Sequence, residues 1–309
     1  MIVTLTANTT MDQTLFVPTF DKGNTIRASR TIQSMGGKPT DASFILGRLG
    51  MPSLALGFAA GVIGAQVTAM LQAQGVTVDF TPVDGETRIN TVIIAEDDHS
   101  HTTITTSTLE VTEEHIGALE MRLREALTGA SCLVIGGTLP HNVPPTFYGA
   151  MIGMAKEANV PVIFDADEPN LSTGLAVAPD FIKPNRHELG RLIGRTVNSL
   201  EDALHAGREI CDTHGTSVIA SLDRDGALAI LPDRAYRIPP LKVEVVSAAG
   251  AGDAILAGIA ASIERGQPIE DGLRLGFATA AAVLLQPGTA MCNREDVERL
   301  LPQVELIAV

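Results

Sequence analysis

The sequence predicts an α/β protein whose mainly parallel sheet carries helices on both faces. Short apolar or β-branched runs alternate with helical patterns between residues 131 and 222, as in the βαβ units of a parallel sheet. The chain has 309 residues, and 45% of them are hydrophobic, which is enough for the sizeable core of one large domain. Because the sheet is predicted to be parallel, we expect a ligand site at the carboxyl ends of its strands.

The individual elements follow from the spacing of the apolar residues. Residues 1–6, MIVTLT, are apolar or β-branched throughout and predict the first strand. This run has neither the basic N-terminal region nor the cleavage site of a signal peptide, so we expect a cytoplasmic protein. In chain order, the later elements are predicted as strand 131–136, helix 147–158, strand 160–165, strand 181–182, helix 187–193, helix 200–214, strand 217–222 and helices 251–265, 269–285 and 294–300. The C-terminal part of the chain is therefore expected to be helical.

Two stretches interrupt this alternation. Residues 15–30 and 90–107 contain extended segments rich in Thr and Val. Within each stretch, these segments follow one another without an intervening helix. In the second stretch, strands are expected at 91–95 and 102–106, joined by a polar connection at 96–100. These segments predict a small separate sheet of hairpin-like strands. The alternative is a β excursion at the edge of the main sheet.

The chain is acidic, with a formal net charge of −14 at pH 7. Such a field repels nucleic acid and anionic membranes, so we expect neither as a partner. No apolar run approaches the roughly 20 residues that a membrane-spanning helix needs. The cysteines at 132, 211 and 292 are odd in number and far apart, which favours a reducing compartment over a disulfide framework and offers no metal-ligand spacing.

The segment 245–253, VVSAAGAGD, precedes an apolar helical run. It predicts a β-branched strand that turns through Gly250 and Gly252 into a helix, where unpaired backbone N–H groups and the positive end of the helix dipole favour a phosphate. Asp253 in the first helical turn could accept a proton from a hydroxyl that attacks this phosphate. The alternative is an ordinary glycine-rich turn with Asp253 as a helix cap.

The segment 181–189, FIKPNRHEL, predicts a short buried strand, a turn at proline and a helix. Asn185 and Glu188 are three residues apart and share one helix face. Together they could hold a hydrated Mg²⁺, which keeps most of its waters and takes few protein ligands. They could also form a capping box with Asn185 as N-cap, and the two interpretations are compatible.

In these two segments, the chain resembles the PfkB, or ribokinase-like, carbohydrate kinases. The run at 250–253 is similar to the C-terminal signature of that family, and Lys183 to Asn185 with Glu188 resembles its nucleotide and magnesium motif. Residues 87–90, TRIN, resemble the sugar-phosphate contact of the branch that contains 1-phosphofructokinase and tagatose-6-phosphate kinase. Further similar segments, in chain order, are 8–12, 36–38, 136–140, 221–227 and 287–289.

The resemblance implies a single kinase domain over residues 1–309. Its fold would be a ribokinase-like three-layer α/β/α core with a small β-sheet lid formed by about residues 10–35 and 86–108. The lid would close over the sugar, exclude water and supply the contact of a homodimer. The implied activity is ATP-dependent phosphorylation of a sugar phosphate, with ATP and Mg²⁺ as cofactors.

The resemblance also implies roles for individual residues. Asp253 would be the general base, and the amides of Gly250, Ala251 and Gly252 would hold the charge on the transferred group. The acceptor would be bound by Asp12, Arg27, Gly36, Gly37, Lys38, Asp41, Arg88, Asn90 and Thr138. The nucleotide would be bound by Lys183, Asn185, Glu188, Ser221, Gly226, Gly288 and Thr289, with Mg²⁺ held through water by Glu188 and Asn185. In so acidic a chain, an enzyme for phosphorylated substrates must gather its few cations at the site.

Several residues depart from the family pattern. Where the family has Gly-Gly-Lys-Gly-x-Asn, residues 36–41 read GGKPTD. Pro39 removes a backbone donor and suits a first helical turn. Asp41 replaces an amide by a carboxylate, which favours a hydroxyl-rich acceptor if it faces the sugar and is otherwise a charge at a helix N-terminus. Gly136, Thr138 and Ala248 also replace hydroxyl residues common in the family.

Three functions therefore stay open. The first is the sugar-phosphate kinase, which the pair of Arg88 and Asn90 favours. The second is a kinase of an unphosphorylated sugar or nucleoside, which Asp41 favours. The third is a catalytically weak protein that senses metabolites, against which Asp253 argues because a binding module needs no base. A dehydrogenase is excluded because no Gly-x-Gly-x-x-Gly turn follows the first strand.

Overall fold

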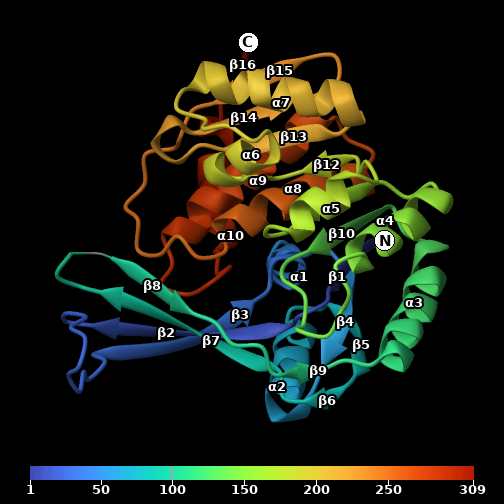
Figure 1. Ribbon diagram of the computed structural model, residues 1–309. Coiled ribbons are helices and arrows are strands. Elements are labelled where there is room, and N and C mark those ends of the chain that lie inside the picture. Colours follow the sequence, from blue (N-terminus) through green and yellow to red (C-terminus); the bar gives the residue numbers. More distant parts are fainter. Residues whose placement is uncertain (99) are drawn as a thin grey trace.

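The computed structural model describes residues 1–98 and 100–309, and in this part of the chain ten strands form one sheet (Figure 1). In spatial order these strands are β16 (Ile307–Ala308), β15 (Ala235–Ile238), β14 (Ala227–Ile230), β13 (Ser217–Ser221), β12 (Phe181–Ile182), β11 (Val162–Asp165), β10 (Cys132–Gly136), β1 (Ile2–Thr6), β4 (Ser53–Ala59) and β5 (Thr77–Pro82). Neighbours from β5 through β13 run parallel, and neighbours from β13 through β16 run antiparallel. The predicted mainly parallel sheet is confirmed.

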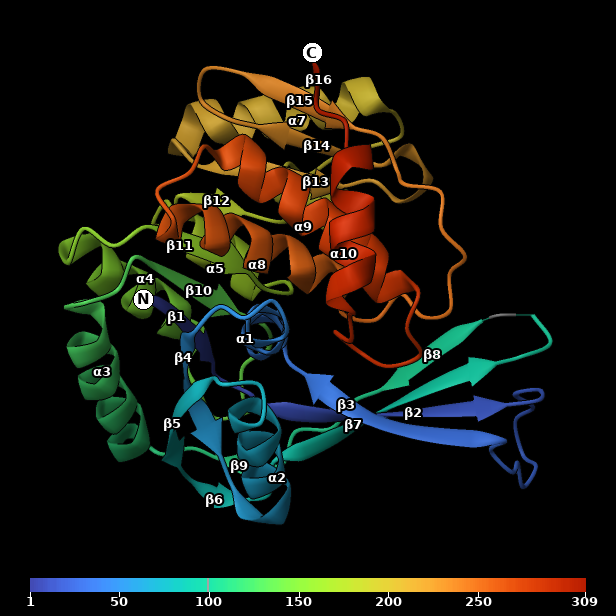
Figure 2. The same ribbon diagram turned by 180° about the vertical axis from the view of Figure 1, so that it is seen from behind.

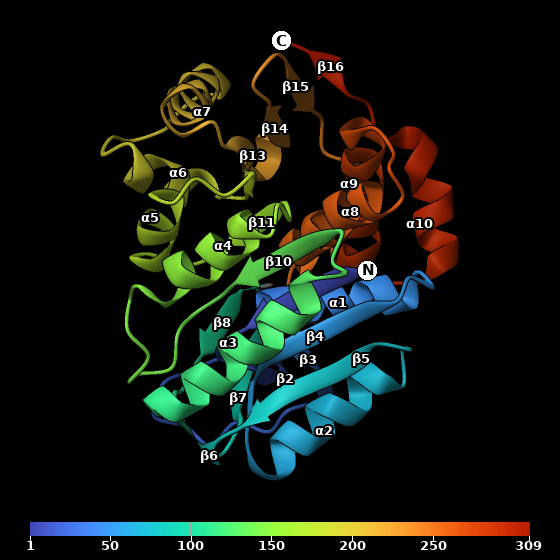
Figure 3. The same ribbon diagram turned by 90° about the vertical axis from the view of Figure 1, so that its right-hand side faces the viewer.

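Helices cover both faces of this sheet, so the molecule has three layers (Figure 3). One face carries α1 (Lys38–Arg48), α8 (Ala251–Glu264), α9 (Ile269–Leu284) and α10 (Arg294–Leu300). The other face carries α3 (Glu113–Leu127), α4 (Phe147–Glu157), α5 (Asn170–Leu175), α6 (Arg186–Leu192) and α7 (Leu200–His214). The remaining helical elements are α2 (Gly61–Gln72), which packs beside β5, and the short 3-10 helices η1 (Asp223–Asp225) and η2 (Leu301–Gln303).

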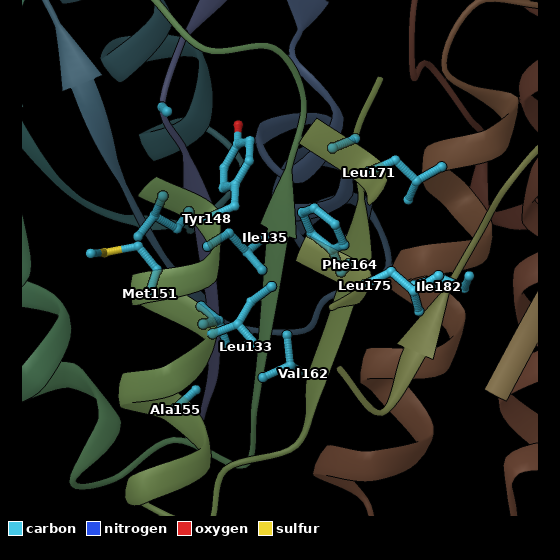
Figure 4. Packing of buried hydrophobic residues seen from close by; sticks show 14 of the residues in the cluster. Leu133, Ile135, Tyr148, Met151, Ala155, Val162, Phe164, Leu171, Leu175 and Ile182 are labelled. Atoms are coloured by element: carbon cyan, nitrogen blue, oxygen red, sulfur yellow. The ribbon is translucent and has the colours of Figure 1, made fainter. Parts of the chain in front are cut away.

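The central strand β10 shows why both faces of the sheet are apolar. Leu133 and Ile135 lie in the core beneath α4, where Tyr148 packs close to them (Figure 4). Cys132 and Val134 belong to the core on the opposite face. Because successive side chains of a strand point to opposite faces, a strand covered by helices on both sides must be apolar throughout.

A second, small sheet projects from the body of the molecule (Figures 1 and 2). Its strands, in spatial order, are β3 (Arg30–Gly36), β2 (Thr10–Val17), β7 (Arg88–Ala95) and β8 (His101–Ile104). The register of β2 places Asp12 beside Ser34 of β3 and Asn90 of β7. A two-stranded sheet of β6 (Asp84–Gly85) and β9 (Leu109–Glu110) lies nearby. The small sheet that was expected from the Thr- and Val-rich segments is thus present and separate from the main sheet.

Most predicted elements agree with the structure to within two residues at each end. The expectation for 15–30 was wrong in its middle, because residues 18–29 form the connection from β2 to β3 rather than extended strand. Residue 99, inside the predicted connection 96–100, lies outside the described residues. Within the described ranges, every helix is too short or too polar to cross a lipid bilayer.

The strand expected before the glycine turn is also absent from the described structure. Val245 and Val246 lie in the irregular segment between β15 and α8, with 58% and 38% of their surfaces exposed. The N–H of Val246 donates to the carbonyl of Leu284 at the C-terminus of α9, at 2.7 Å. The β propensity of valine is overridden here because no neighbouring strand is available to pair with this segment.

Candidate active site

The carboxyl ends of the central strands meet the N-termini of two helices at one place. Asp165 ends β11, Lys183 follows β12, and Ser221 ends β13. The N-termini of α1 and α8 come to the same region, because the first-turn residue Asp41 of α1 is hydrogen-bonded to Asp253 of α8. The predicted location of the site, at the carboxyl ends of the strands, corresponds to this convergence.

The turn before α8 depends on glycine. Gly250 is the N-cap of α8 and adopts the left-handed conformation, with φ of 80°. A Cβ added to Gly250 would lie 2.3 Å from the backbone nitrogen of Ala290, so a side chain is excluded on both grounds. Within the turn, the N–H of Ala251 donates to Ala248 at 3.4 Å and that of Asp253 to Gly250 at 3.1 Å. These two amides are therefore already used inside the turn.

Asp253 is buried in the first turn of α8, with 8% of its surface exposed. Burial, and then the nearby charge of Asp165, raise the pKa of Asp253 to about 7, although Lys183 and Lys38 act in the opposite direction. A carboxyl group with a pKa near neutral pH suits proton exchange with a substrate. Its neighbour Asp41 is a helix N-terminal residue, as one of the two interpretations from sequence expected, but it contacts the Asp253 carboxyl group.

Two lysines from distant segments share one buried aspartate. Lys183 Nζ lies 2.9 Å from one carboxylate oxygen of Asp165, and Lys38 Nζ lies 2.8 Å from the other. Lys38 also contacts Asp167 at 2.9 Å. Burial alone would raise the pKa of Asp165, but the two lysines outweigh it and lower that pKa. Asp165 therefore remains charged and holds both ammonium groups in place.

Asp165 was not among the residues singled out from the sequence. A usable signal was present, since it is the last residue of a predicted strand and ligands of parallel sheets lie at strand ends. Lys183 connects this cluster to the glycine turn, because a Cβ on Gly252 would lie 3.1 Å from Lys183 Nζ. The structure thus brings together the segments 181–189 and 250–253.

Asn185 and Glu188 form the capping box that was one of their two interpretations. The side chain of Asn185 accepts the N–H of Glu188 at 2.9 Å, and the Glu188 carboxylate accepts the N–H of Asn185 at 2.8 Å. Asn185 also forms an isolated bridge with Ser221, so two segments of the expected nucleotide site are adjacent.

The fit of Mg²⁺ can be judged from the same residues. The cap uses only Oε2 of Glu188, so Oε1 makes no hydrogen bond within the described part of the chain. In that part, no three acidic, histidine or cysteine side chains are grouped as ligands of a bare ion. One available carboxylate oxygen beside Asn185 fits a Mg²⁺ that keeps most of its waters.

The base of the small sheet forms the other side of the site. Asp12 accepts a hydrogen bond from Asn90 Nδ2 at 3.0 Å and one from Thr289 Oγ1 at 2.8 Å. Burial raises the pKa of Asp12, although these two hydrogen bonds and Arg88 act against it. A Cβ on Gly36 would lie 2.4 Å from Asp12, so this glycine allows the close approach.

Arg88 and Thr138 meet beside Asp12, although they lie 50 residues apart in the chain. Arg88 Nη2 donates to Thr138 Oγ1 at 3.0 Å, and Nη1 donates to the Thr106 carbonyl at 3.0 Å. Asn8 Nδ2 reaches the same Thr138 oxygen at 3.3 Å. The Nε of Arg88 is buried and, among the described residues, has no hydrogen-bond partner. An anion placed here would satisfy a donor that the protein leaves unpaired.

Some predicted site residues lie elsewhere than the sequence suggested. Arg27 is exposed in the connection from β2 to β3, at the end of the small sheet remote from Asp12. Gly288 and Thr289, expected at the nucleotide, lie against the small sheet, where the N–H of Thr289 donates to Ser34 Oγ at 3.0 Å. Gly226 follows η1 as expected for a loop beside Ser221.

A hollow of about 870 Å³ opens beside the site, along α6, the segment 194–198 and Asp223. Of the predicted site residues, only Asn185 lines it. Arg186 lines this hollow, and its guanidinium already donates hydrogen bonds to the Leu222 carbonyl, at 3.2 Å, and to the carboxylate of Asp225. The hollow adjoins the cluster of lysines and aspartates rather than containing it.

A buried carboxyl group, a glycine turn at a helix N-terminus and two anchored lysines are features that phosphoryl transfer requires, because this reaction needs mainly positioning and charge neutralisation. The model of the pfkB family carbohydrate kinases matches residues 3–296. Two curated relatives are 1-phosphofructokinase of Bacillus subtilis, 30% identical with 99% of both chains covered, and D-tagatose-1-phosphate kinase of Bacillus licheniformis, 31% identical with 96% of both covered. The solved structure of phosphofructokinase-2 from Escherichia coli in complex with substrates and products has a TM-score of 0.91 and 25% identity, covering 98% of both chains.

The chain belongs to the PfkB family of carbohydrate kinases. It is an ATP-dependent carbohydrate kinase with a ribokinase-like α/β fold. The family, the fold class and the enzyme class predicted from the sequence are therefore confirmed.

Proposed function

We propose that the protein transfers the γ-phosphoryl group of ATP to a hydroxyl group of a sugar phosphate. The observation that carries this proposal is Arg88, whose buried Nε has no partner among the described residues and whose guanidinium lies beside Asp12 and Thr138. A neutral sugar would offer this donor only a weak neutral acceptor, whereas a phosphate group would accept a charged hydrogen bond from it. The names of the two curated relatives, both kinases of phosphosugars, support the same acceptor class.

On the acceptor side, Asp12 and Asn90 would orient the sugar hydroxyls. Their hydrogen bond, and the one from Thr289, fix the direction of the Asp12 carboxylate before the sugar arrives. Arg88 would hold the phosphate already present on the acceptor, and its planar guanidinium suits two phosphate oxygens at once. Lys38, tied to Asp165 and Asp167, would add a second positive charge.

On the nucleotide side, Lys183 would contact the ATP phosphates while Asp165 holds its ammonium group. Ser221 and Gly226 would border the nucleotide. Asn185 and Glu188 would hold Mg²⁺ through water, and Glu188 has a carboxylate oxygen left over from the capping box for this purpose. Bound Mg²⁺ would supply neutralisation of the phosphate charge.

In the transfer step, the acceptor hydroxyl oxygen forms a bond to the γ-phosphorus of ATP, the bond from that phosphorus to the bridging oxygen breaks, and ADP leaves. Asp253 takes the hydroxyl proton. The amides of Gly250 and Gly252, at the N-terminus of α8, would stabilise the charge on the transferred group, since those of Ala251 and Asp253 are bonded within the turn.

The test is ADP release with Mg-ATP against fructose 1-phosphate, fructose 6-phosphate, tagatose 6-phosphate, and unphosphorylated sugars and nucleosides. Turnover confined to phosphorylated acceptors is the expected result. Turnover only on unphosphorylated acceptors would reject the proposal and support the alternative that Asp41 suggested. Absence of turnover on every member of the panel, with ATP binding retained, would favour the metabolite sensor.

Replacing Arg88 by methionine is expected to raise KM for the phosphorylated acceptor by roughly 10- to 100-fold while KM for ATP stays within about twofold. The expected cause is the loss of charged hydrogen bonds to the acceptor phosphate. Arg122→Met is a matched control, because Arg122 pairs with Asp79 away from the site. Equal losses for phosphorylated and unphosphorylated acceptors would show that Arg88 is structural.

The small sheet would act as a lid and as the contact of a homodimer. The apolar side chains of its strands, such as Phe16 and Ile93, are already buried within the chain, but Phe20 in the connection from β2 to β3 and Ile104 at the end of β8 are exposed by 39% and 52%. A four-stranded sheet that projects from the body with exposed apolar side chains is better stabilised when a second surface covers them. Analytical ultracentrifugation is expected to show a dimer, and a monomer at micromolar concentration would contradict this role.

A further inference from the structure

Asp41 and Asp253 bring two carboxyl groups into direct contact inside the protein. Asp41 lies in the first turn of α1 and Asp253 in the first turn of α8, and the two helices pack against each other on one face of the sheet. Only 2% of the surface of Asp41 and 8% of that of Asp253 are exposed. The side chains are hydrogen-bonded to each other. A hydrogen bond between two carboxyl groups requires that one of them carries a proton.

The charged groups around the pair decide which carboxyl group keeps this proton. Asp12 of the small sheet and Asp165 of β11 add negative charge from two sides. The two cations that act on Asp253 are Lys183 and Lys38, and both pair with Asp165, at 2.9 and 2.8 Å. Asp41 forms no ion pair among the described residues, and its Oδ1 is buried without a hydrogen-bond partner there. An ionised Asp41 would therefore be a buried charge without compensation.

The two groups differ in what stabilises their charged forms. Burial, followed by the charges of Asp253 and Asp12, raises the pKa of Asp41 well above its ordinary value. Burial and the charge of Asp165 raise the pKa of Asp253 as well, to about 7, although Lys183 and Lys38 act in the opposite direction. The position of Lys183 separates the two groups, because its Nζ lies beside the turn that carries Asp253, 3.1 Å from where a Cβ of Gly252 would be. A cation therefore lies beside Asp253, which favours the proton of the pair on Asp41 and makes Asp253 the acceptor.

We infer that Asp41 is a positioning residue for the transfer reaction, a neutral carboxylic acid that donates a hydrogen bond to Asp253 and holds it as an oriented, ionised base. The inference rests on the proposed function, in which Asp253 accepts the hydroxyl proton. The Asp41 proton stays on Asp41 throughout the step, while the acceptor proton moves to the other oxygen of Asp253. A neutral acid has one donor and one acceptor, so the amide of asparagine can replace it in shape and in hydrogen bonding.

Two substitutions separate this role from a structural one. Asp41→Ala removes the donor, and we expect kcat to fall roughly 10- to 100-fold and the acid limb of the kcat pH profile to move up by about one pH unit, because Asp253 loses a bond that favours its charged form. Asp41→Asn keeps a donor, so kcat within about threefold of wild type and an acid limb close to the wild-type position are expected.

The direction of the pH shift is decisive. If Asp41 were ionised, its removal would take away a negative charge, and the acid limb would move to lower pH. Three results would overturn the inference. They are a shift of the acid limb to lower pH in Asp41→Ala, an acid limb that does not move in Asp41→Ala, and an Asp41→Asn variant that is as impaired as Asp41→Ala. Ser43→Ala is the matched control: Ser43 is buried in α1 and bonded to Thr4 and Ser53, so its loss should affect stability without moving the limb.

An infrared measurement tests the same point without turnover and in variants of identical shape. In slightly alkaline buffer, wild type should show a carboxylic-acid carbonyl band that Asp41→Asn lacks, and a wild-type spectrum without this band would contradict the inference. The variant Asp253→Asn distinguishes the role of Asp253 as general base from the role of Asp41 as its positioning residue. Full turnover in Asp253→Asn would reject the base itself, whereas lost turnover there together with an unmoved limb in Asp41→Ala would reject only Asp41.

Discussion

Replacing Asp253 by asparagine is expected to lower kcat by about 10²- to 10⁴-fold, the usual contribution of a positioned general base. The dissociation constant for ATP should change less than about twofold, because Asp253 acts on the acceptor hydroxyl and not on the nucleotide. Steady-state kinetics and calorimetric ATP binding measure the two effects. Asp271→Asn provides a matched control, since Asp271 also lies in the first turn of a helix but pairs with Arg274 at the surface.

The pH dependence of kcat provides a second check on Asp253. Its pKa is raised to about 7, and a base is active only when it is ionised. The wild-type kcat should therefore fall as the pH decreases through this value. The residual activity of Asp253→Asn should lack this acid limb. A wild-type profile that stays flat from pH 8 down to about pH 5 would contradict Asp253 as the base.

The largest expected effect on stability comes from Asp165→Asn. This change leaves Lys183 buried beside a neutral amide, and breaking a buried ion pair on one side costs about 3–5 kcal/mol of unfolding free energy. Lys38 retains Asp167 and contributes less to the loss. Urea denaturation at neutral pH measures the difference. In the control Asp167→Asn, the lost partner is half exposed, and a cost of about 0–1 kcal/mol is expected.

The same substitution should alter the acid sensitivity of the protein. The pKa of Asp165 is lowered in the folded state, so its ion pairs stabilise the fold above the ordinary aspartate pKa and are lost as the pH falls through the lower, folded value. Wild type should thus lose stability over this acidic range. Asp165→Asn should lack that portion of the loss, and parallel stability curves for the two proteins would show that Asp165 is not charged in the fold.

The fold could be predicted because local patterns of apolar residues specify its strands and helices, and these patterns repeat along the chain. The alternating apolar segments predicted β10, α4, β11 and α7 to within two residues. Pro39 was expected to suit a first helical turn and lies at the start of α1. Val245 and Val246 show the limit of such reasoning, since their β propensity had no neighbouring strand to pair with.

The sequence by itself determined the family, the enzyme class and the motifs around Lys183, Asn185 and Asp253, because these residues lie in short contiguous patterns. Only the tertiary structure decided which distant side chains meet. It gave Lys38 and Lys183 a common partner in Asp165, set Thr289 against Asp12, and left Arg27 at the far end of the small sheet. It also joined Asp41 to Asp253, a pairing that depends on how α1 packs on α8. Such contacts depend on distances between segments up to 277 residues apart, and no local pattern encodes them.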